Sequence, residues 1–550
     1  MSSLSLVLHG AAREAVDTQV PGLVDHEFAS RLMAQDHTLW GPAAEDEAAK
    51  RLGWVSLFET SRELIPRIQR LREELTAEGV DRVVLAGMGG SSLAPEVICA
   101  VHGVELTVLD STDPQHVASV LAEDIDRTVL VVSSKSGSTV ETDTQRRLVS
   151  AAFERTGIDP ASRTVVVTDP GSPLAESAAA DGVRAVVEAD PTVGGRYSAL
   201  TAFGLVPSGL AGADLEALIE EAEDAAVVLT EDDAANPGLQ LGAAMGGTRP
   251  LRNKLIITDQ GSPLTGLGAW IEQLVAESTG KDSTGVLPVI VGDGEPELSR
   301  EDHDALVVAL VDPDQDGGDA GTGEELIVSE HLVRTGGSLG AQFLLWEVAT
   351  AVAGSLLGIN PFDQPDVESA KAAARGLLEE PAVESGQASL DGAVELRGLG
   401  GAEASGSLVD SLRNLVTSVP EDGYVAIMAY LDRTAEQRLE AIRAQLSALT
   451  GRPVTFGWGP RFLHSTGQFH KGGPHTGVFL QITAGTGDHG DTADLDVPGR
   501  PFSVGQLIAA QADGDAEVLA QAGMPVLSLR LGRRSAGIDQ ILDAVDALVG

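Results

Sequence analysis

Two series of short, continuously apolar runs constrain the fold of this chain more than any other feature. The first series is DRVVLAG, ELTVLD, RTVLVVS and RTVVVTD, at residues 81–87, 105–110, 127–133 and 163–169. The second is NKLIITD, VLPVIVGD, DALVVALV and EELIVSE, at 253–259, 286–293, 304–311 and 324–330. Helix-like segments separate the runs. Strands that are apolar on both faces and alternate with helices indicate parallel sheets covered on both sides.

The length of 550 residues exceeds what one hydrophobic core can support, so we expect several domains. The apolar pattern at 338–358 predicts a long buried helix, and the glycine- and serine-rich stretch at 384–406 predicts a link of low order. The predicted order is an N-terminal helical segment at 1–60, a first α/β domain at 61–212, a helical connector at 213–239, a second α/β domain at 240–380 and a C-terminal α/β region at 381–550.

The net charge of −45 excludes some partners and restricts others. A surface this acidic repels nucleic acid and anionic membranes, so we expect neither as a partner. It also repels a phosphorylated substrate, so any phosphate pocket must be built locally from backbone N–H groups and a few cations. The N-terminus has no basic region followed by a long apolar segment, and no apolar run approaches the roughly 20 residues of a membrane span. We therefore expect a cytoplasmic protein.

The single cysteine, Cys99, excludes a disulfide within the chain and a metal site built on cysteines. Three histidines among glycines, His464, His470 and His475, raise the question of a different metal site. Their spacing of six and five residues is not that of a helical ligand pair, and no carboxylate lies between them. We expect a hydrogen-bonded structural loop there and no metal.

A glycine-rich turn follows the first apolar run, in GMGGSSLAPEV at 87–97. Glycines between a strand and a helix let the backbone approach a ligand, and a helix N-terminus favours an anion. Gly90 and Ser91 are the candidate ligand-binding residues. The spacing differs from that of a dinucleotide fingerprint. A tight turn without a ligand is the alternative.

The strand at 127–133 leads into SSKSGSTVET, at 133–142. Ser134, Ser136, Ser138 and Thr139 supply four hydroxyls in six residues, Lys135 adds a positive charge, and the following helix start adds N–H donors. Phosphate oxygens need many donors in a small volume, so this loop is a candidate phosphate site. The alternative is an ordinary helix cap, since STVE, which ends at Glu141, is a capping-box pattern.

The stretch WIEQLVAESTGK, at 270–281, predicts a helix that ends near Gly280, with Glu277 in its last turn. The helix dipole disfavours a carboxylate there by about 0.3–1 kcal/mol, which favours proton uptake by a general base. A solvated surface glutamate is the alternative.

Two further stretches contain candidate polar groups. Arg196, in GGRYSAL at 194–200, could stabilise an oxyanion or be a surface residue. In NPFDQPDVESAK, at 360–371, two prolines form a rigid turn, after which Gln364 and Lys371 lie about two helical turns apart on one side.

Taken in order, GMGGSSLAPE, SSKSGSTVET, GGRYS, ESTGK and FDQPDVESAK resemble the glucose-6-phosphate isomerase family, in the branch that also occurs fused to transaldolase. The resemblance covers about 61–380, and GPRFLHSTGQ resembles that branch's C-terminal region. No transaldolase barrel is visible. The resemblance implies an α/β fold with two doubly wound, parallel-sheet sugar-isomerase (SIS) units in tandem.

The resemblance also implies residue roles. Glu277 matches the base that moves a proton between C2 and C1, and Arg196 matches the residue that stabilises the cis-enediolate. The family's ring-opening histidine corresponds either to His303, in GEPELSREDH, or to His470, in TGQFHKGG. Several residues match substrate or phosphate contacts: Gly90, Ser91, Ser134, Lys135, Ser136, Thr139, Gln273, Gln364 and Lys371. Glu141 and Gln364 match positions that support these contacts.

A carboxylate can move a proton between adjacent carbons without a metal or an organic cofactor, so we expect no cofactor. The expected function is interconversion of glucose 6-phosphate and fructose 6-phosphate by a homodimer. Two alternatives stay open: a sugar-phosphate sensor without catalysis, and an isomerase for another sugar phosphate such as mannose 6-phosphate.

Overall fold

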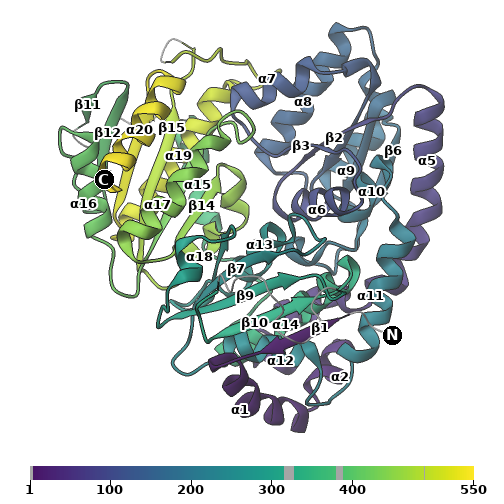
Figure 1. Ribbon diagram of the computed structural model, residues 1–550. Helices are drawn as coiled ribbons and strands as arrows, with labels where there is room; N and C mark the ends of the chain where they lie inside the picture. Colours follow the sequence, from purple (N-terminus) through teal and green to yellow (C-terminus); the bar gives the residue numbers. More distant parts are fainter. Residues whose placement is uncertain (1–3, 315–326, 380–387, 488–489, 550) are drawn as a thin grey trace. The chain divides into compact units, whose positions relative to one another are not determined.

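The structure is a computed structural model that describes residues 4–314, 327–379, 388–487 and 490–549, without the side chains of 367–371 and 379. Contacts divide the chain into two compact units. Unit 1 contains residues 1–110, 124–294 and 298–363, and unit 2 contains residues 111–123, 295–297 and 364–550. Figure 1 labels the helices and strands of both units.

The first sheet of unit 1 has five parallel strands in the order β3-β2-β4-β5-β6. The first four are β2 (Arg82–Gly87), β3 (Thr107–Leu109), β4 (Thr128–Ser133) and β5 (Thr164–Thr168), which confirm the first apolar series. The fifth, β6 (Ala185–Glu188), is short and half-exposed, and the apolar pattern missed it. The helices that follow these strands include α6 (Leu93–Val101), α8 (Val140–Arg155), α9 (Pro173–Asp181) and α10 (Ala202–Ala211).

The second sheet of unit 1 has the order β1-β10-β9-β7-β8. Strands β7 (Lys254–Gln260), β8 (Leu287–Val291), β9 (Ala305–Val311) and β10 (Leu332–Gly336) are parallel, and β1 (Ser5–Leu8) joins β10 antiparallel. The prediction of a purely helical segment at 1–60 is therefore wrong for SLVL, which pairs with LVRTG more than 300 residues away. The strand expected at 324–330 starts at Leu332 instead, and residues 324–326 lie outside the described residues.

The N-terminal part of unit 1 is otherwise helical, as expected. Its helices include α1 (Ala11–Asp25), α2 (Phe28–Met33), α3 (Glu45–Arg51), α4 (Leu57–Thr60), α5 (Ile65–Ala77) and the 3-10 turn η2 (Gly53–Ser56). The acidic connector forms α11 (Leu215–Leu229) and leads to α12 (Pro237–Gly246). Helix α13 (Leu267–Thr279) links β7 and β8.

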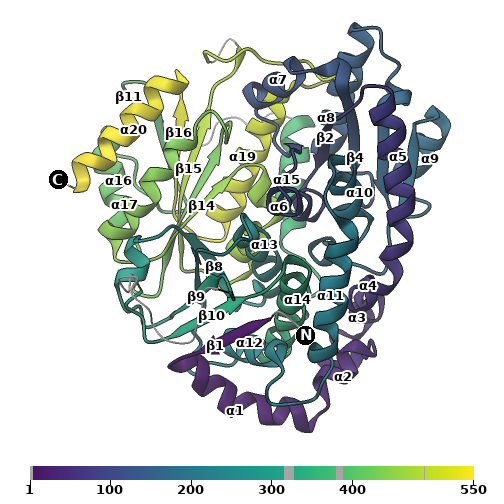
Figure 2. The ribbon, with the colours of Figure 1, turned by 45° about the vertical axis from the view of Figure 1, so that its right-hand side comes forward.

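Helix α14 (Leu339–Leu357) lies at the centre of unit 1 and packs against α11, α12 and α13 (Figure 2). By length and composition this helix is apolar enough to cross a membrane, but 89% of its apolar window is buried inside the protein. It therefore has the burial of a core helix, as predicted for 338–358. Trp270 of α13 packs edge-on against Phe343 of α14 at 4.6 Å between ring centroids.

Unit 2 is built on a six-stranded sheet in the order β11-β12-β16-β15-β13-β14. Strands β13 (Tyr424–Tyr430), β14 (Val454–Trp458), β15 (Gly477–Ala484) and β16 (Val526–Leu531) are parallel, and β11 (Ser389–Asp391) and β12 (Val394–Leu399) form an antiparallel edge. Its helices are α7 (Pro114–Ala122), α15 (Val367–Glu379), α16 (Leu408–Thr417), α17 (Ala441–Thr450), α18 (Gly467–Gly472), α19 (Val504–Gln521) and α20 (Arg534–Val549).

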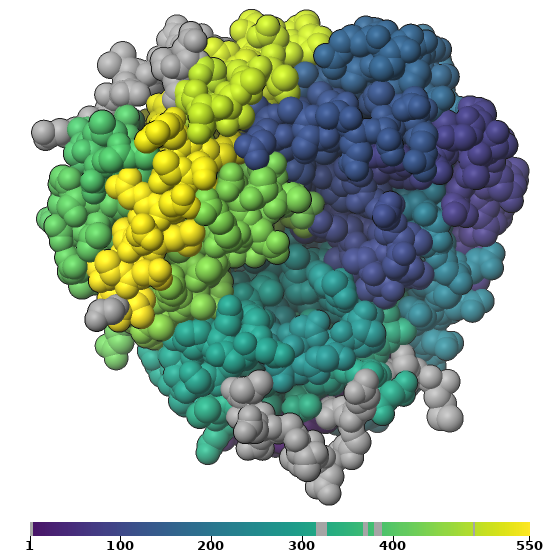
Figure 3. Space-filling model, turned by 45° about the horizontal axis from the view of Figure 1, so that its top comes forward, coloured from purple at the N-terminus to yellow at the C-terminus, as the bar shows by residue number. Residues whose placement is uncertain are grey.

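Segments far apart in the sequence meet in unit 2. Helices α16 and α20 lie side by side, and green and yellow atoms adjoin there in Figure 3. Part of the stretch predicted as a low-order link, 384–406, instead forms β11 and β12, because β12 hydrogen bonds to the late strand β16. Residues 380–387 lie outside the described residues.

The division into units differs from two of the predicted domain boundaries. Residues 111–123, within the predicted first domain, lie in unit 2, where Arg534 forms a buried ion pair with Asp113 at 2.7 Å. Residues 364–380, assigned to the second domain, also lie in unit 2, where α15 packs against α19. The sequence pattern could not predict either contact, because each joins residues that are more than 100 positions apart in the chain.

The close packing of α12 on α14 leads to a stability prediction. A Cβ at Gly242 would lie 2.5 Å from Cβ of Val352 and 2.7 Å from the carbonyl oxygen of Ala349. We expect Gly242→Ala to lower the free energy of unfolding by about 1–3 kcal/mol, since the helices must separate. Thermal and urea denaturation measure the change.

Gly22→Ala in α1 is the matched control. A Cβ there would meet no atom of the described residues within 4 Å. This substitution should stabilise the protein by roughly 0.5–1 kcal/mol through helix propensity alone. Equal effects of the two substitutions would contradict the packing account.

Candidate active site in unit 1

Two loops meet where the strand order of the first sheet reverses. The chain runs from β2 to β3 on one side and then returns to β4 on the other side of β2, and Gly87 at the end of β2 pairs with Ser133 at the end of β4. In open α/β sheets, ligands bind in the crevice outside the carboxyl ends of strands at such a reversal. The glycine-rich turn and the 134–139 loop both begin at this point.

The loop of residues 134–139, here called the hydroxyl loop, folds on its own side chains. The Ser134 hydroxyl accepts from the Gly137 N–H at 3.2 Å and donates to Thr139 Oγ1 at 3.4 Å, and the Ser136 and Ser138 hydroxyls are 2.7 Å apart. Gly137 has φ +73°, and a Cβ there would lie 2.4 Å from Cβ of Leu174. The loop therefore turns tightly and concentrates hydroxyls ahead of α8.

The alternative of a plain helix cap does not account for this loop. Thr139 is the N-cap residue of α8, but its side chain makes no capping hydrogen bond. Glu141, in the first turn, is buried at 6% exposure. The hydroxyls and the N-terminus of a sixteen-residue helix thus form one donor-rich surface, suited to an anion.

Lys135 ties the hydroxyl loop to the segment before Arg196. Its ammonium forms an ion pair with Asp169 at 2.8 Å and donates to the carbonyl of Val193 at 2.9 Å. Burial raises the pKa of Asp169, and Lys135 opposes that rise. The contacts fix Lys135 beside the loop, where its charge offsets the acidic surroundings.

The glycine-rich turn packs directly on the GGRYS segment. Gly90 lies in the 3-10 turn η4 (Gly89–Ser91), and a Cβ there would be 1.9 Å from the carbonyl oxygen of Gly195. Ser198 donates to the carbonyl of Gly90 at 3.3 Å. Ser91 ends the same turn and is half-buried. Only glycine permits this backbone approach, which places the turn η7 (Gly195–Tyr197) beside η4.

Arg196 and Glu277 form the charged centre of the site. The Arg196 guanidinium lies 3.4 Å from Oε1 of Glu277 and donates to the backbone carbonyls of Glu277 at 3.0 Å, Pro361 at 3.1 Å and Asp363 at 3.3 Å. The arginine side chain is 3% exposed, whereas the Glu277 side chain is 16% exposed. A fixed buried cation therefore stands beside a carboxylate that solvent reaches.

The base helix, α13, supplies a second polar group. Gln273, one turn before Glu277, donates from Nε2 to Glu277 Oε2 at 3.2 Å. With Arg196 at Oε1 and Gln273 at Oε2, both carboxylate oxygens have a partner. The structure thus brings together Arg196, Gln273 and Glu277 as the motifs predicted.

Lys281 and Asp363 were not singled out from the sequence, although both lie inside quoted motifs. The Lys281 ammonium contacts Asp363 Oδ1 at 2.7 Å and donates to the carbonyls of Asn360 and Asp363, both at 2.6 Å. Burial, followed by the charge of Arg196, lowers the pKa of Lys281 to about 8. The sequence signal for Lys281 was its position directly after the predicted helix end, in the motif ESTGK.

The structure does not bring every predicted residue to this centre. His303 is exposed in the turn before β9, and no contact among the described residues joins it to Arg196 or Glu277. Gln364 is exposed, follows Asp363 in the chain and belongs to unit 2. Lys371 falls within α15, but its side chain lies outside the described residues.

His470, the rival ring-opening histidine, is buried in unit 2. Its Nδ1 is 2.9 Å from the Tyr424 hydroxyl, its ring stacks on Tyr424, and the Phe479 ring packs edge-on against it. Burial lowers the pKa of His470 to about 3, so the ring is neutral at physiological pH. The structure assigns it the packing of a core histidine. In the described ranges, no three His, Cys, Asp or Glu side chains converge in a way that could hold a metal ion.

Comparison with known proteins agrees with this geometry. The family model described as phosphoglucose isomerase matches residues 60–232, which include the glycine-rich turn, the hydroxyl loop and Arg196. The glucose-6-phosphate isomerase of Rubrobacter xylanophilus is 31% identical over 378 residues, which cover 58% of this chain and 87% of the relative. The chain belongs to the phosphoglucose isomerase family.

Further relatives share the same name. The probable glucose-6-phosphate isomerase of Natronomonas pharaonis is 31% identical and covers 60% of this chain and 86% of its own length. Among solved structures, a hypothetical protein from Thermus thermophilus has a TM-score of 0.55 and 27% identity, covering 68% of this chain and all of that protein. A glucose-6-phosphate isomerase from Chlamydia trachomatis has a TM-score of 0.51 and 18% identity, covering 66% and 86%, which supports the phosphoglucose isomerase fold.

The lowered pKa of Lys281 predicts a pH dependence of stability. An unfolded lysine titrates near 10.4, whereas folded Lys281 releases its proton near pH 8. Between these two pH values, Lys281 binds more protons in the unfolded state than in the folded state. The free energy of unfolding therefore rises with pH over this range, by up to about 3 kcal/mol. Urea unfolding of wild type and Lys281→Met at pH 7.5 and about pH 10 measures the difference.

The wild type should gain stability relative to Lys281→Met across this window. Because other groups titrate equally in both proteins, the difference isolates Lys281. A stability difference that stays constant with pH would contradict the lowered pKa.

Proposed function

We propose that this chain interconverts glucose 6-phosphate and fructose 6-phosphate by proton transfer through a cis-enediolate. The observation that carries the proposal is the Arg196–Glu277 pair: a solvent-reached carboxylate, 3.4 Å from a buried guanidinium, on a helix end. Membership of the phosphoglucose isomerase family supports the substrate class.

The hydroxyl loop and the glycine-rich turn would bind the phosphate. The chain has a net charge of −45, so the anion must be recognised at short range. Ser134, Ser136 and Thr139, the N–H groups at the start of α8 and the charge of Lys135 offer such recognition. Binding at this end of the sugar would hold C1 and C2 in place for reaction at Glu277.

Glu277 would act as the general base. In the open-chain aldose, its carboxylate takes the proton from C2, and the C1=C2 bond forms as the electron pair moves onto O1. The negative oxygen is stabilised by Arg196, whose guanidinium cannot lose its proton. The Glu277 carboxyl then returns the proton to C1, while the proton on O2 passes to the negative O1, which leaves a hydroxyl at C1 and a ketone at C2. The reverse sequence converts the ketose to the aldose.

Ring opening requires a separate acid and base. Of the two candidate histidines we favour His303, because the His303 side chain is exposed whereas His470 is enclosed by aromatic rings. The role of a ring-opening histidine comes from the family resemblance. His303→Ala should lower turnover of the cyclic sugar more than His470→Phe, as measured by comparing both variants in a coupled assay.

The two alternatives differ in what they require. A sugar-phosphate sensor needs the hydroxyl loop but not a carboxylate held between a buried arginine and a glutamine, so the Arg196–Glu277 pair favours an enzyme. An isomerase for mannose 6-phosphate would use the same base. It would differ from a glucose-6-phosphate isomerase in the residues that contact the sugar at C2, where the two substrates are epimers. Turnover of the two aldose phosphates distinguishes these substrates.

A homodimer is also part of the proposal and rests on the family resemblance. The chain has a mass of 56.8 kDa, so size-exclusion chromatography with light scattering should give about twice this value. A monomeric mass for the active protein would contradict the dimer.

The role of Glu277 gives the first kinetic prediction. Glu277→Gln keeps the shape of the side chain but cannot accept the proton, so kcat should fall by roughly 10²–10⁴-fold while binding of fructose 6-phosphate stays nearly unchanged. Coupled assays and calorimetric titration measure the two quantities.

Glu272→Gln, on the same helix, is the matched control and should keep wild-type kcat. Turnover of Glu277→Gln near that of the control would remove Glu277 from the mechanism.

The role of the hydroxyl loop gives the second kinetic prediction. Ser134→Ala combined with Thr139→Ala should raise KM for fructose 6-phosphate by roughly tenfold or more, since each lost hydrogen bond to a charged group is worth about 1.5–3 kcal/mol. Ser162→Ala, in an exposed 3-10 turn, is the control. An unchanged KM in the double variant would argue against phosphate binding by this loop.

A further inference from the structure

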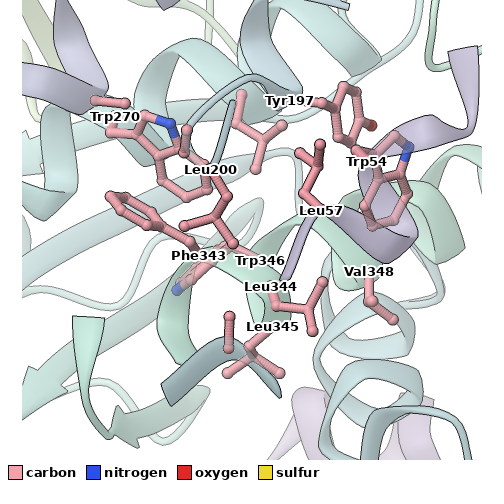
Figure 4. Packing of buried hydrophobic residues seen from close by; sticks show 14 of the residues in the cluster. Trp54, Leu57, Tyr197, Leu200, Trp270, Phe343, Leu344, Leu345, Trp346 and Val348 are labelled. Carbon is pink, nitrogen blue, oxygen red and sulfur yellow. The ribbon is translucent and has the colours of Figure 1, made fainter. Parts of the chain in front are cut away.

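Unit 2 has a polar sheet face that the proposed function does not use. In unit 1 the core around α14 is apolar, with side chains such as Phe343, Leu344 and Trp346 packed together (Figure 4). In unit 2, α16, α17 and α20 form an apolar core on one face of the six-stranded sheet, whereas α19 and α15 lie on the other side (Figure 2). Because successive strand residues point to opposite faces, the polar residues that alternate with those of the apolar core face α19.

The strand register places these polar residues in two neighbouring rows. In the first row, Glu395 of β12 pairs with Arg530 of β16, and Arg530 pairs with Thr483 of β15. In the second row, Arg397 of β12 pairs with Ser528 of β16. Arg397 and Arg530 are therefore diagonal neighbours on antiparallel strands, and such neighbours lie about 7–8 Å apart. Two arginine side chains at this separation can reach the same small anion.

A cavity lies between the polar face and α19. The residues of the two rows line it from the sheet, and the helix residues that line it are Ile508, Ala509, Ala512 and Asp513. Ala509 and Asp513 are exposed, so the cavity opens to solvent along one edge of α19. It has about 50 Å³ of room for the centres of water molecules, compared with roughly 10–15 Å³ for a single water. A small ligand group fits in this space.

The cavity also lies where the strand order of the unit 2 sheet reverses. The chain runs from β13 to β14 on one side and then returns to β15 on the other side of β13. Tyr430 at the carboxyl end of β13 pairs with Thr483 near the carboxyl end of β15, and both residues line the cavity. Ligands bind at such reversals in open α/β sheets. Unit 2 therefore has a ligand-binding position of its own, separate from the site in unit 1.

The two arginines indicate the chemistry of the ligand. The Arg397 side chain is 18% exposed and donates to Glu395 at 3.3 Å, and Arg530 is half-buried. Guanidinium groups present planar pairs of N–H donors that match carboxylate and phosphate oxygens. One such pair satisfies a planar carboxylate. Donors from two arginines and from the Thr483 hydroxyl, which approach from different directions, suit a tetrahedral phosphoryl group.

The acidic residues of the cavity restrict the ligand further. Glu395 lines it from the sheet and Asp513 from the helix. Either carboxylate would repel a second negative group beside the first. The cavity is therefore suited to a ligand with one compact anionic group.

We propose that this cavity binds the phosphoryl group of a small phosphorylated metabolite between Arg397 and Arg530, with the Thr483 hydroxyl as a further donor. The site is additional to the proposed function and does not depend on it, because every lining residue belongs to unit 2. The chain carries a net charge of −45, so recognition of the anion depends on these short-range donors.

Calorimetric titration with inorganic phosphate tests the site. The titration uses the full chain carrying Ser134→Ala and Thr139→Ala, which weakens binding to the hydroxyl loop of unit 1. This protein should bind one phosphate per chain. Adding Arg530→Gln should weaken binding by roughly 10- to 100-fold, because hydrogen bonds to charged groups are the strong ones.

Arg413→Gln in the same background is the matched control. Arg413 is an exposed arginine of α16, on the opposite side of the sheet, so this substitution makes the same change in net charge away from the cavity. It should leave phosphate affinity within about twofold of the background protein, since exposed charges beyond a Debye length are screened.

Ala509→Glu keeps the proposal testable if Arg530→Gln does not fold. Residue 509 is exposed at the opening of the cavity and lies within α19, where glutamate is a good helix former. The added carboxylate should weaken phosphate binding by roughly tenfold through repulsion at short range.

Four outcomes would overturn the proposal. They are no phosphate binding in the background protein, unchanged affinity in a folded Arg530→Gln or Ala509→Glu variant, equal loss of affinity in Arg413→Gln, and tighter binding of acetate than of phosphate. The last outcome would assign the cavity to a carboxylate. Loss of the proposed function is a separate result, because it appears as a wild-type protein without isomerase turnover and leaves these titrations unchanged.

Discussion

The buried guanidinium of Arg196 is the constraint on which the site depends. A charge that is almost fully removed from water is tolerated only when its N–H groups have strong acceptors. Here the acceptors come from the end of α13 and from residues 361–363, which are far apart in the sequence. Satisfying one cation therefore fixes three chain segments relative to one another within unit 1 and leaves Glu277 beside it with access to solvent.

Lys281 repeats this arrangement at the same place. It binds Asp363 and two carbonyls of the 360–363 turn, so this turn, which follows α14, accepts hydrogen bonds from two cations, Arg196 and Lys281. On a chain with 82 acidic and 37 basic residues, three cations, Lys135, Arg196 and Lys281, are held by specific contacts around one site. The long-range repulsion of an anionic substrate is thus offset only at short range, where hydroxyls and N–H groups also contribute.

Local sequence patterns predicted the parts of the fold that depend on local chemistry. Continuous apolar runs identified β2, β4, β5, β7 and β9, and the hydroxyl loop and the end of α13 were visible from residue type and spacing. The pattern failed where pairing over long distances decides the structure. SLVL was predicted as part of a helical segment, yet it forms β1 because it hydrogen bonds to the edge strand β10. Strand β12 likewise depends on hydrogen bonds to β16, which lies about 130 residues later in the sequence. Lys281 was missed because its role comes from burial beside Asp363, which residue type alone does not reveal.

The central claim is that one carboxylate moves a proton between C2 and C1. The most direct test is nuclear magnetic resonance of the products formed from glucose 6-phosphate deuterated at C2, in ordinary water. A single base that exchanges slowly with solvent predicts that part of the deuterium appears at C1 of fructose 6-phosphate and part is lost to water, and that Glu277→Gln stops both processes together. Absence of deuterium at C1 with complete loss to water, or undiminished transfer in Glu277→Gln, would contradict the account.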